Sequence, residues 1–336
     1  MKHIEELVAK VVNGERRALS RAITLVESAR ADHQQQAQAL LQIAGQGGRQ
    51  ALRIGLSGTP GVGKSTFIEA FGSFLTAQGL RVAVLAVDPS STRSGGSILG
   101  DKTRMDRLSR DKNAFIRPSP SQSHLGGVGR RTRAVVALCE AAGFDVILIE
   151  TVGVGQSETM VAEMSDIFTL LLAPAGGDEL QGVKRGIMEI ADLILVNKAD
   201  GDLKPQAIRT TADYAGALRL LRKRAQDPDG FPKAQPVSAL NEDGLAQVWE
   251  DMQTLSAWRK SHGHWDKTRA RQAVHWFDEE VRTRLLARLD RDPEIAALRQ
   301  SLRATLLEGE TSPDAAADLV LAALKGASSP APSSGS

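Results

Sequence analysis

Residues 58–65 read Gly-Thr-Pro-Gly-Val-Gly-Lys-Ser, and this stretch decides the fold. It matches the pattern G-x-x-x-x-G-K-[ST], in which main-chain N–H groups turn inward around a polyphosphate. In that pattern Lys64 reaches the β- and γ-phosphates, and the hydroxyl of Ser65 binds Mg²⁺. A short apolar run precedes the loop at 52–57 and a helical pattern follows it at 66–75, so the strand–loop–helix context is complete. The nucleotide contacts predicted here are Gly58, Thr59, Pro60, Gly61, Val62, Gly63, Lys64, Ser65 and Thr66.

The bulk composition excludes several classes of protein. The chain has 336 residues, a formal net charge of +2 and one cysteine, Cys139. The charge carries no signature of nucleic-acid or anionic-membrane binding, and we interpret the basic run at 219–224 as a solvated helix face. A single cysteine excludes an intramolecular disulfide, so we expect a buried structural thiol and a reducing compartment. No apolar run approaches the ~20 residues of a membrane helix, and no signal segment begins the chain. We therefore expect a cytoplasmic protein.

Strands and helices alternate through the middle of the chain. The strand candidates are continuous apolar runs, as expected of parallel strands covered on both faces; they lie at 52–57, 82–87, 145–150, 167–172, 193–197 and 235–238. The stretches between them are long enough for crossover helices, which predicts an α/β domain with a mainly parallel sheet. Helical extensions flank this domain. The predicted division is a helical extension at 1–48, the nucleotide domain at 49–260, a helical region at 261–325 and a disordered tail at 326–336.

The C-terminal region carries two helix signals. Val274, Phe277, Val281, Leu285 and Leu289 form an apolar stripe at helical spacing. Residues 311–325 predict a last helix, with Thr311 or Ser312 as its cap and Pro313 just inside it. The stripe is compatible with dimerisation and equally with packing inside one subunit.

Asn197-Lys-Ala-Asp200 follows a strand candidate and matches the Asn-Lys-x-Asp pattern of GTPases. The carboxylate of Asp200 can accept hydrogen bonds from N1–H and the exocyclic amine of guanine together. Adenine would leave that carboxylate unpaired, which is costly in a buried site. Lys198 would lay its stem over the ring, and the loop Ser238, Ala239 and Leu240 would offer a main-chain N–H to the base.

Carboxylates also end two strand candidates. Glu150 closes an apolar strand, where an unpaired charge is expensive, so we interpret it as holding the water shell of Mg²⁺. Gly153 follows it and would contact the γ-phosphate through its N–H. Asp88 ends the second strand candidate and either faces the ligand crevice or caps a turn with Pro89. Glycine-rich segments at 126–129, 153–158 and 176–184 are either movable loops or tight turns.

Several longer motifs resemble the MeaB/ArgK family of P-loop GTPases, to which the human MMAA protein is related. They are Ala86-Val-Asp-Pro-Ser-Ser-Thr-Arg93, Gly95-Gly-Ser-Ile-Leu-Gly-Asp-Lys-Thr-Arg-Met105, Ala114-Phe-Ile-Arg-Pro-Ser119, Glu150-Thr-Val-Gly-Val-Gly-Gln-Ser-Glu158 and Gly177-Asp-Glu-Leu-Gln-Gly182. The resemblance runs from about residue 10 to residue 325 and is more specific than the phosphate loop alone. Departing from ordinary GTPases, this chain has Glu150 where they carry Asp.

The resemblance implies a function and a set of roles. Family members are homodimeric chaperones of adenosylcobalamin-dependent acyl-CoA mutases; they gate cofactor loading from an adenosyltransferase, which is a further expected partner, and protect the mutase. Adenosylcobalamin would sit on the mutase rather than on this chain. The resemblance places Ser65, Asp88, Asp101 and Glu150 around Mg²⁺ and makes 261–325 a dimerisation arm. Residues 150–158, with Gln156, would be a second switch, and Asp178, Glu179, Gln181 and Lys184 would belong to a third.

The sequence identifies the residues that catalyse hydrolysis less clearly than those that bind the nucleotide. Lys64, Asp101, Glu150 and Lys184 are the candidate catalytic residues, but no position is marked as a water-orienting glutamine or an arginine finger. We therefore predict slow hydrolysis of GTP alone and faster hydrolysis with the mutase. Three alternatives stay open: an ATP-dependent kinase or transport ATPase, a metal-insertion GTPase using His262 and His264, and a cobalamin carrier using His124, where Gln122 replaces the expected Asp.

Overall fold

The computed structural model describes residues 2–28, 30–87, 105–118, 125–151, 157–174, 185–221 and 223–326. The chain forms two compact units, residues 1–273 and residues 274–336. The finer division at residues 48 and 260 stays a prediction.

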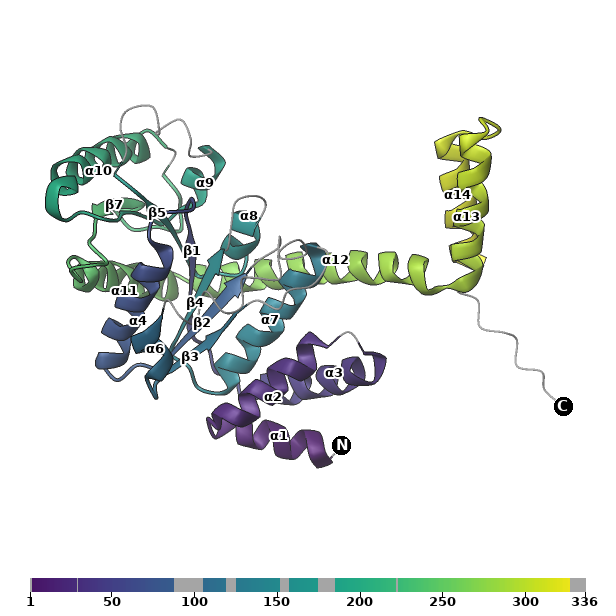
Figure 1. Cartoon of the computed structure of the whole chain (residues 1–336), viewed down its shortest axis with the longest axis horizontal. Helices are drawn as coiled ribbons and strands as arrows, with labels where there is room; N and C mark the ends of the chain where they lie inside the picture. Colours follow the sequence, from purple (N-terminus) through teal and green to yellow (C-terminus); the bar gives the residue numbers. More distant parts are fainter. Residues whose placement is uncertain are drawn as a thin grey trace. The chain divides into compact units, whose positions relative to one another are not determined.

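A parallel sheet is the frame of the first unit (Figure 1). Within the described residues it has seven strands in the order β3-β2-β4-β1-β5-β6-β7, every neighbouring pair being parallel. The strands are β1 Leu52–Ser57, β2 Val82–Val87, β3 Ala114–Arg117, β4 Val146–Thr151, β5 Ile167–Leu172, β6 Leu193–Val196 and β7 Lys233–Pro236. The predicted α/β fold with a parallel sheet is confirmed. The strand β1, which enters the phosphate loop, lies at the centre between β4 and β5.

Helices cover both faces of this sheet (Figure 1). On one face, α4 (Lys64–Ala77), α6 (Asp106–Arg110) and α11 (Leu245–Ser261) share one apolar core with the strands. Phe67 and Phe71 of α4 stack with ring centroids 5.3 Å apart, and Trp249 of α11 meets Phe71 edge-on at 6.3 Å. On the other face lie α7 (Leu125–Ala141) and α8 (Ser157–Ala162). Three further elements of this unit are α9 (Arg185–Ile190), a 3₁₀ turn at Gly201–Leu203 and α10 (Lys204–Arg219).

Three N-terminal helices, α1 (Lys2–Val12), α2 (Arg16–Glu27) and α3 (Ala31–Gly45), belong to the same unit. They pack on one another, and α2 and α3 also pack on α7. Leu19, Ile23 and Val26, spaced four and three residues apart on α2, are all buried. The N-terminal extension therefore shares its packing with the helix layer of the sheet.

Helix α12 (His264–Arg291) begins in the first unit and ends in the second, which also holds α13 (Pro293–Leu307) and α14 (Pro313–Gly326). Asp292 caps α13, because its carboxylate accepts from the N–H groups of Glu294 at 3.0 Å and Ile295 at 3.3 Å. Ser312 caps α14 in the same way, through the N–H of Ala315 at 3.2 Å, as predicted. The α12 stripe is exposed at Val274, Phe277, Val281 and Leu285.

Several segments differ from the sequence-based expectations. The strand β3 and the helix α13 were not predicted, and β7 ends two residues earlier than expected. The solvated helix face proposed at 219–224 is wrong, because α10 ends at Arg219 and Arg224 lies on the buried carboxylates Asp192 (2.8 Å) and Asp227 (2.6 Å).

Arg259 of α11 joins the same cluster, reaching Asp192 at 2.6 Å and Asp227 at 2.7 Å. These carboxylates raise the pKa of Arg259 despite the opposing effect of its burial. None of the described helices is long and apolar enough to cross a membrane.

Candidate functional site

The phosphate loop connects the carboxyl end of β1 to the first turn of α4. Gly63 stands at φ 90°, and a Cβ on it would come within 2.7 Å of Nδ2 of Asn197, so conformation and space both require glycine. Lys64 is the first residue of α4, and its Nζ donates to the main-chain carbonyls of Gly58 and Thr59. Burial lowers the pKa of Lys64, and the carboxylates of Glu150 and Glu158 oppose that shift. The loop thus places a cation and a helix N-terminus at one point, as a polyphosphate site requires.

Glu150 lies beside this loop. In the sheet it pairs with Leu56 of β1 on one side and with Ala86 of β2 on the other, and it is 3 % exposed. Because the strands are parallel, their carboxyl ends meet at one edge, so Glu150 stands next to the entry of the phosphate loop. A buried carboxylate near Lys64, together with the hydroxyl of Ser65 on α4, is the donor set that a nucleotide-bound Mg²⁺ takes.

Asn197 connects the base motif to the phosphate loop. Its Nδ2 donates to the carbonyl of Val62 at 2.9 Å, and its Oδ1 accepts from the N–H of Ala239 at 3.0 Å. The side chain is 2 % exposed and follows the end of β6. One amide therefore holds the phosphate loop and the loop after β7 together. The next residue, Lys198, stands at φ 61° with Cε 4.0 Å from a Cβ built on Gly63, so its stem lies over the site.

The carboxylate of Asp200, which the sequence predicts to recognise the base, is held by the loop after β7. The hydroxyl of Ser238 donates to Oδ2 of Asp200 and accepts from the N–H of Asn241 at 3.1 Å. Ser238 and Asp243 exchange two main-chain hydrogen bonds of 3.0 Å, which close the loop around Leu240. This brings together the predicted base contacts Asn197, Lys198, Asp200, Ser238, Ala239 and Leu240.

Three charged residues that sequence analysis did not single out tie this loop to α4 and α6. Oε1 of Glu69 accepts from the N–H groups of Arg107 at 2.7 Å and Leu108 at 3.3 Å, so it caps α6. The guanidinium of Arg107 donates to Glu242 at 2.6 Å. Glu242 stands at φ 57° in the loop after β7, residues 237–244, which we call the base loop. Local sequence carries no signal for this connection, because its members are 38 and 135 residues apart.

Part of the predicted site lies outside the described residues. This applies to Asp88, Asp101, Gly153, Gln156, Asp178, Glu179, Gln181, Lys184, the pair Gln122 and His124, and the tail after residue 326. Their roles stay predictions.

The metal-insertion alternative receives no support from the part of the chain that the structure describes. No group of three or more His, Cys, Asp or Glu side chains there could hold a metal ion. The ring of His262 stacks on Trp258 at 3.6 Å, and its Nδ1 lies 3.0 Å from the carbonyl of Trp258. These contacts hold His262 on α11.

The phosphate loop, the base motif and the buried strand-end carboxylate agree with a comparison against protein families. The model described as "Methylmalonyl Co-A mutase-associated GTPase MeaB" matches residues 19–294. This chain belongs to the MeaB family. The match takes in the whole sheet and part of both helical extensions.

Individual relatives agree with the MeaB assignment. The chain is 48 % identical over 332 residues to "Methylmalonic aciduria type A homolog, mitochondrial" of Mus musculus, covering 96 % of this chain and 80 % of the mouse protein. It is 46 % identical over 293 residues to "GTPase ArgK" of Escherichia coli, covering 86 % and 88 %. A solved structure described as "LAO/AO transport system kinase" matches with a TM-score of 0.75 and 35 % identity over 97 % of this chain and 98 % of that one.

The chain is therefore a P-loop GTPase that binds GTP and hydrolyses it. The kinase description belongs to the solved relative and carries no nucleotide preference to this chain. The hydroxyl of Ser238 holds the carboxylate of Asp200, the residue that the sequence predicts to recognise guanine.

Proposed function

We propose that this MeaB-family GTPase is a chaperone of an adenosylcobalamin-dependent acyl-CoA mutase. It gates loading of the cofactor, received from an adenosyltransferase, and protects the mutase from inactivation. The observation that carries the proposal is the family match over residues 19–294, whose description names a methylmalonyl-CoA mutase. The mouse relative, 48 % identical, takes its name from methylmalonic aciduria, which supports the same substrate class.

The chemistry proposed for the site follows from its donors. Lys64 and the N-terminus of α4 would hold the phosphates, and the hydroxyl of Ser65 with Glu150 would hold Mg²⁺. Asp88 and Asp101 complete the proposed metal set. When bound, Mg²⁺ supplies charge that offsets the negative charge of the phosphate oxygens. Glu150 would act through the water shell of the metal, since a buried carboxylate needs a cation nearby.

Hydrolysis is proposed to be slow until the mutase binds. The phosphate loop itself, residues 58–65, contains no glutamine that could orient the water and no arginine that could act as a finger. The third switch, with Asp178, Glu179, Gln181 and Lys184, would carry the signal of the partner to the nucleotide. Gln156 and Gly153 would belong to the second switch, which precedes α8.

The proposed assembly is a homodimer formed through the C-terminal unit. The apolar stripe of α12 is exposed, with Phe277 at 66 % and Val274 at 62 %. An exposed run of large apolar side chains at helical spacing is typical of a helix that packs on a partner. We propose that a second copy of this chain packs on the apolar stripe of α12. Sedimentation of the Phe277→Asp variant tests this dimer. The wild-type protein should sediment as a dimer and the variant as a monomer; a monomeric wild type would overturn the dimer.

The chaperone role is tested by co-purification with candidate mutases. The tagged GTPase is mixed with methylmalonyl-CoA mutase or isobutyryl-CoA mutase, and GTP turnover is measured for each pair and for each protein alone. We expect one mutase to bind and to accelerate turnover roughly tenfold or more, below the roughly 10³- to 10⁵-fold of an arginine finger. An unrelated acyl-CoA enzyme serves as the control. If no mutase binds and none accelerates turnover, the chaperone role is wrong while the GTPase assignment stands.

A further inference from the structure

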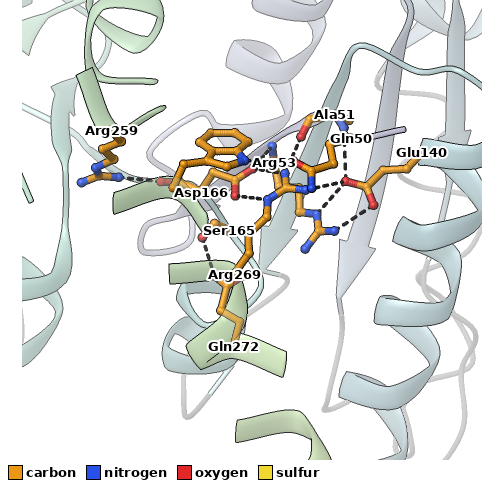
Figure 2. Close-up of polar contacts among 10 residues, drawn as sticks. Gln50, Ala51, Arg53, Glu140, Ser165, Asp166, Arg259, Arg269 and Gln272 are labelled. Atoms are coloured by element: carbon orange, nitrogen blue, oxygen red, sulfur yellow. Dashed lines mark hydrogen bonds and ion pairs between the residues drawn. The ribbon is translucent and has the colours of Figure 1, made fainter. Parts of the chain in front are cut away.

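The turn at 163–166 joins α8 to β5 and is held by side chains of α11 and α12, about 100 residues later in the sequence. Figure 2 shows Arg259 of α11 and Arg269 and Gln272 of α12 converging on Ser165 and Asp166. Helix α8 itself begins at Ser157, directly after the segment that contains Glu150 and Gly153. The turn therefore holds the end of the first helix that follows the proposed second switch.

The last turn of α8 rests on β1. A Cβ built on Gly55 would lie 2.3 Å from Oγ of Ser165 and 2.9 Å from Cγ1 of Val161, so glycine is needed for this close approach. The hydroxyl of Ser165 donates to the carbonyl of Val161 at 2.6 Å, which ties the turn to the helix. Because β1 leads into the phosphate loop three residues later, α8 and the loop share one rigid support.

The two ends of the peptide link between Ser165 and Asp166 are held differently. Asp166 is fixed by charge: its carboxylate accepts from Nε of Arg269 at 2.9 Å, from Nη2 of Arg269 at 2.7 Å and from the N–H of Arg53 at 2.9 Å. Its carbonyl accepts from Nη1 of Arg259 at 2.6 Å. The carbonyl of Ser165 is held by one neutral donor, Nε2 of Gln272, at 2.8 Å. Charge-assisted hydrogen bonds are about twice as strong as neutral ones, so Ser165 is the more adjustable residue.

Gln272 is also under-satisfied. Its side chain is 5 % exposed, and its Oε1 has no hydrogen-bond partner among the described residues. A buried amide oxygen without a donor is costly, so a small change in the turn that supplied one would be favoured. This makes the contact between Gln272 and Ser165 a place where two arrangements of the α8 base can differ in free energy.

We propose that Gln272 is a positioning residue for GTP hydrolysis. Through the carbonyl of Ser165 it sets the direction in which α8 leaves its turn, and the first residues of α8, Ser157 and Glu158, belong to the proposed second switch. The inference rests on the proposed role of residues 150–158 as a switch. Gln272 acts through the arrangement of α8 and not through contact with the nucleotide. Replacing it should therefore change the rate of GTP hydrolysis and leave the affinity for GDP unchanged.

The test is the Gln272→Met variant, which keeps the length of the side chain and removes both polar atoms. Single-turnover hydrolysis of GTP should fall roughly three- to tenfold, within the range typical of mutations that alter coupling between sites. The affinity for GDP, measured by calorimetry, should stay within about twofold of wild type. Gln247→Met on α11 is the matched control, because Gln247 makes only a 3.4 Å contact with Asp251 away from the turn.

A second variant guards against a folding defect. Gln272→Asn keeps the amide but shortens the side chain, so it cannot reach the carbonyl of Ser165 from the same backbone position. It should show the same loss of hydrolysis with retained GDP binding. Unchanged hydrolysis in every folded variant would overturn the proposal. A loss of GDP affinity that parallels the loss of hydrolysis would also overturn it, because a purely structural role would lower both quantities.

Hydrogen exchange of the wild-type protein then separates this inference from the chaperone role. Protection of the amides of α8 should differ between the GDP-bound and GTP-analogue-bound protein; equal protection would overturn the inference. None of these assays contains a mutase, so failure of mutase activation would leave their results unaffected.

Discussion

Nδ2 of Asn197 donates a hydrogen bond to the carbonyl of Val62 at 2.9 Å, so the base motif holds the phosphate loop in place. The two residues are 135 positions apart and lie on loops that follow β6 and β1. The other side-chain atom, Oδ1, accepts from Ala239 in the base loop. One buried amide therefore links the phosphate loop to the loop after β7.

Replacing Asn197 with Ala should weaken GTP and GDP binding together. The change removes two buried hydrogen bonds and leaves the carbonyl of Val62 without this donor, at a cost of about 2–3 kcal/mol in binding free energy. That corresponds to a roughly 30- to 150-fold loss of affinity, measurable by calorimetry. Asn241→Ala, in the exposed part of the base loop, should bind as wild type does; a wild-type Kd for Asn197→Ala would show that the loop keeps its shape without the amide.

The Asp200→Asn variant should change which base is accepted. An amide offers both a donor and an acceptor where the carboxylate offers acceptors alone, so guanine loses a hydrogen bond and xanthine, with a carbonyl in place of the exocyclic amine, gains one. We expect preference to move from GTP towards xanthosine triphosphate in competition assays. Retained preference for GTP over xanthosine triphosphate would contradict the role of Asp200 in base recognition.

The ion pair of Arg107 and Glu242 should contribute little to stability. Their side chains are 60 % and 48 % exposed, and exposed pairs are typically worth about 0.2–1 kcal/mol. A double-mutant cycle with Arg107→Ala and Glu242→Ala in urea denaturation should give a coupling energy in that range, decreasing with added salt. A coupling energy above about 2 kcal/mol would contradict this prediction, because solvent screens exposed ion pairs to smaller values.

Lys184→Ala should reduce the acceleration of GTP turnover by the mutase and leave GTP affinity nearly intact. Lys184 belongs to the proposed third switch rather than to the phosphate loop, so its loss should affect signalling more than binding. Turnover is compared with and without mutase, and Lys204→Ala, an exposed lysine on α10, is the control. An isolated wild-type protein that already turns over as fast as its complex would contradict the proposed activation.

Cys139 should react with thiol reagents only when the protein opens. It is fully buried on α7, and burial, together with the neighbouring Glu140, raises its pKa far above the usual range. Because the thiolate is the reactive form and a raised pKa keeps the buried thiol protonated, alkylation of the folded protein at pH 7 should be far slower than alkylation of the unfolded protein at the same pH. Urea should expose the thiol and accelerate alkylation. Rapid labelling of the folded protein at pH 7 would show that α7 opens locally.

The central part of the fold could be predicted because its constraints are local. The phosphate loop needs glycine at 63 and lysine at 64, and the apolar runs of β1, β2 and β5 have the predicted bounds. Cys139 is buried, as predicted. The base motif, too, is read from four consecutive residues. In each case the chemistry of one short segment determines what it does.

Segments that depend on distant partners could not be predicted. The edge strand β3 has only four residues, too few for a period to show. Arg224 is half-buried and Arg259 is buried, because Asp192 and Asp227 meet them from other elements. Their charge indicates solvent exposure when the sequence is considered alone, since an isolated buried cation would be prohibitively costly. Gln272 carries no signal at all, because its partner is a main-chain carbonyl.

The two edges of the sheet have a consequence for solubility at high concentration. Both outer strands, β3 and β7, have four residues; Pro118 follows β3 directly, and Pro236 ends β7. Proline has no N–H to offer, and so short an edge presents few main-chain groups to a foreign strand. Aggregation by strand addition is therefore disfavoured from the folded state of this domain, and any β-type aggregate should have to begin from unfolded chain.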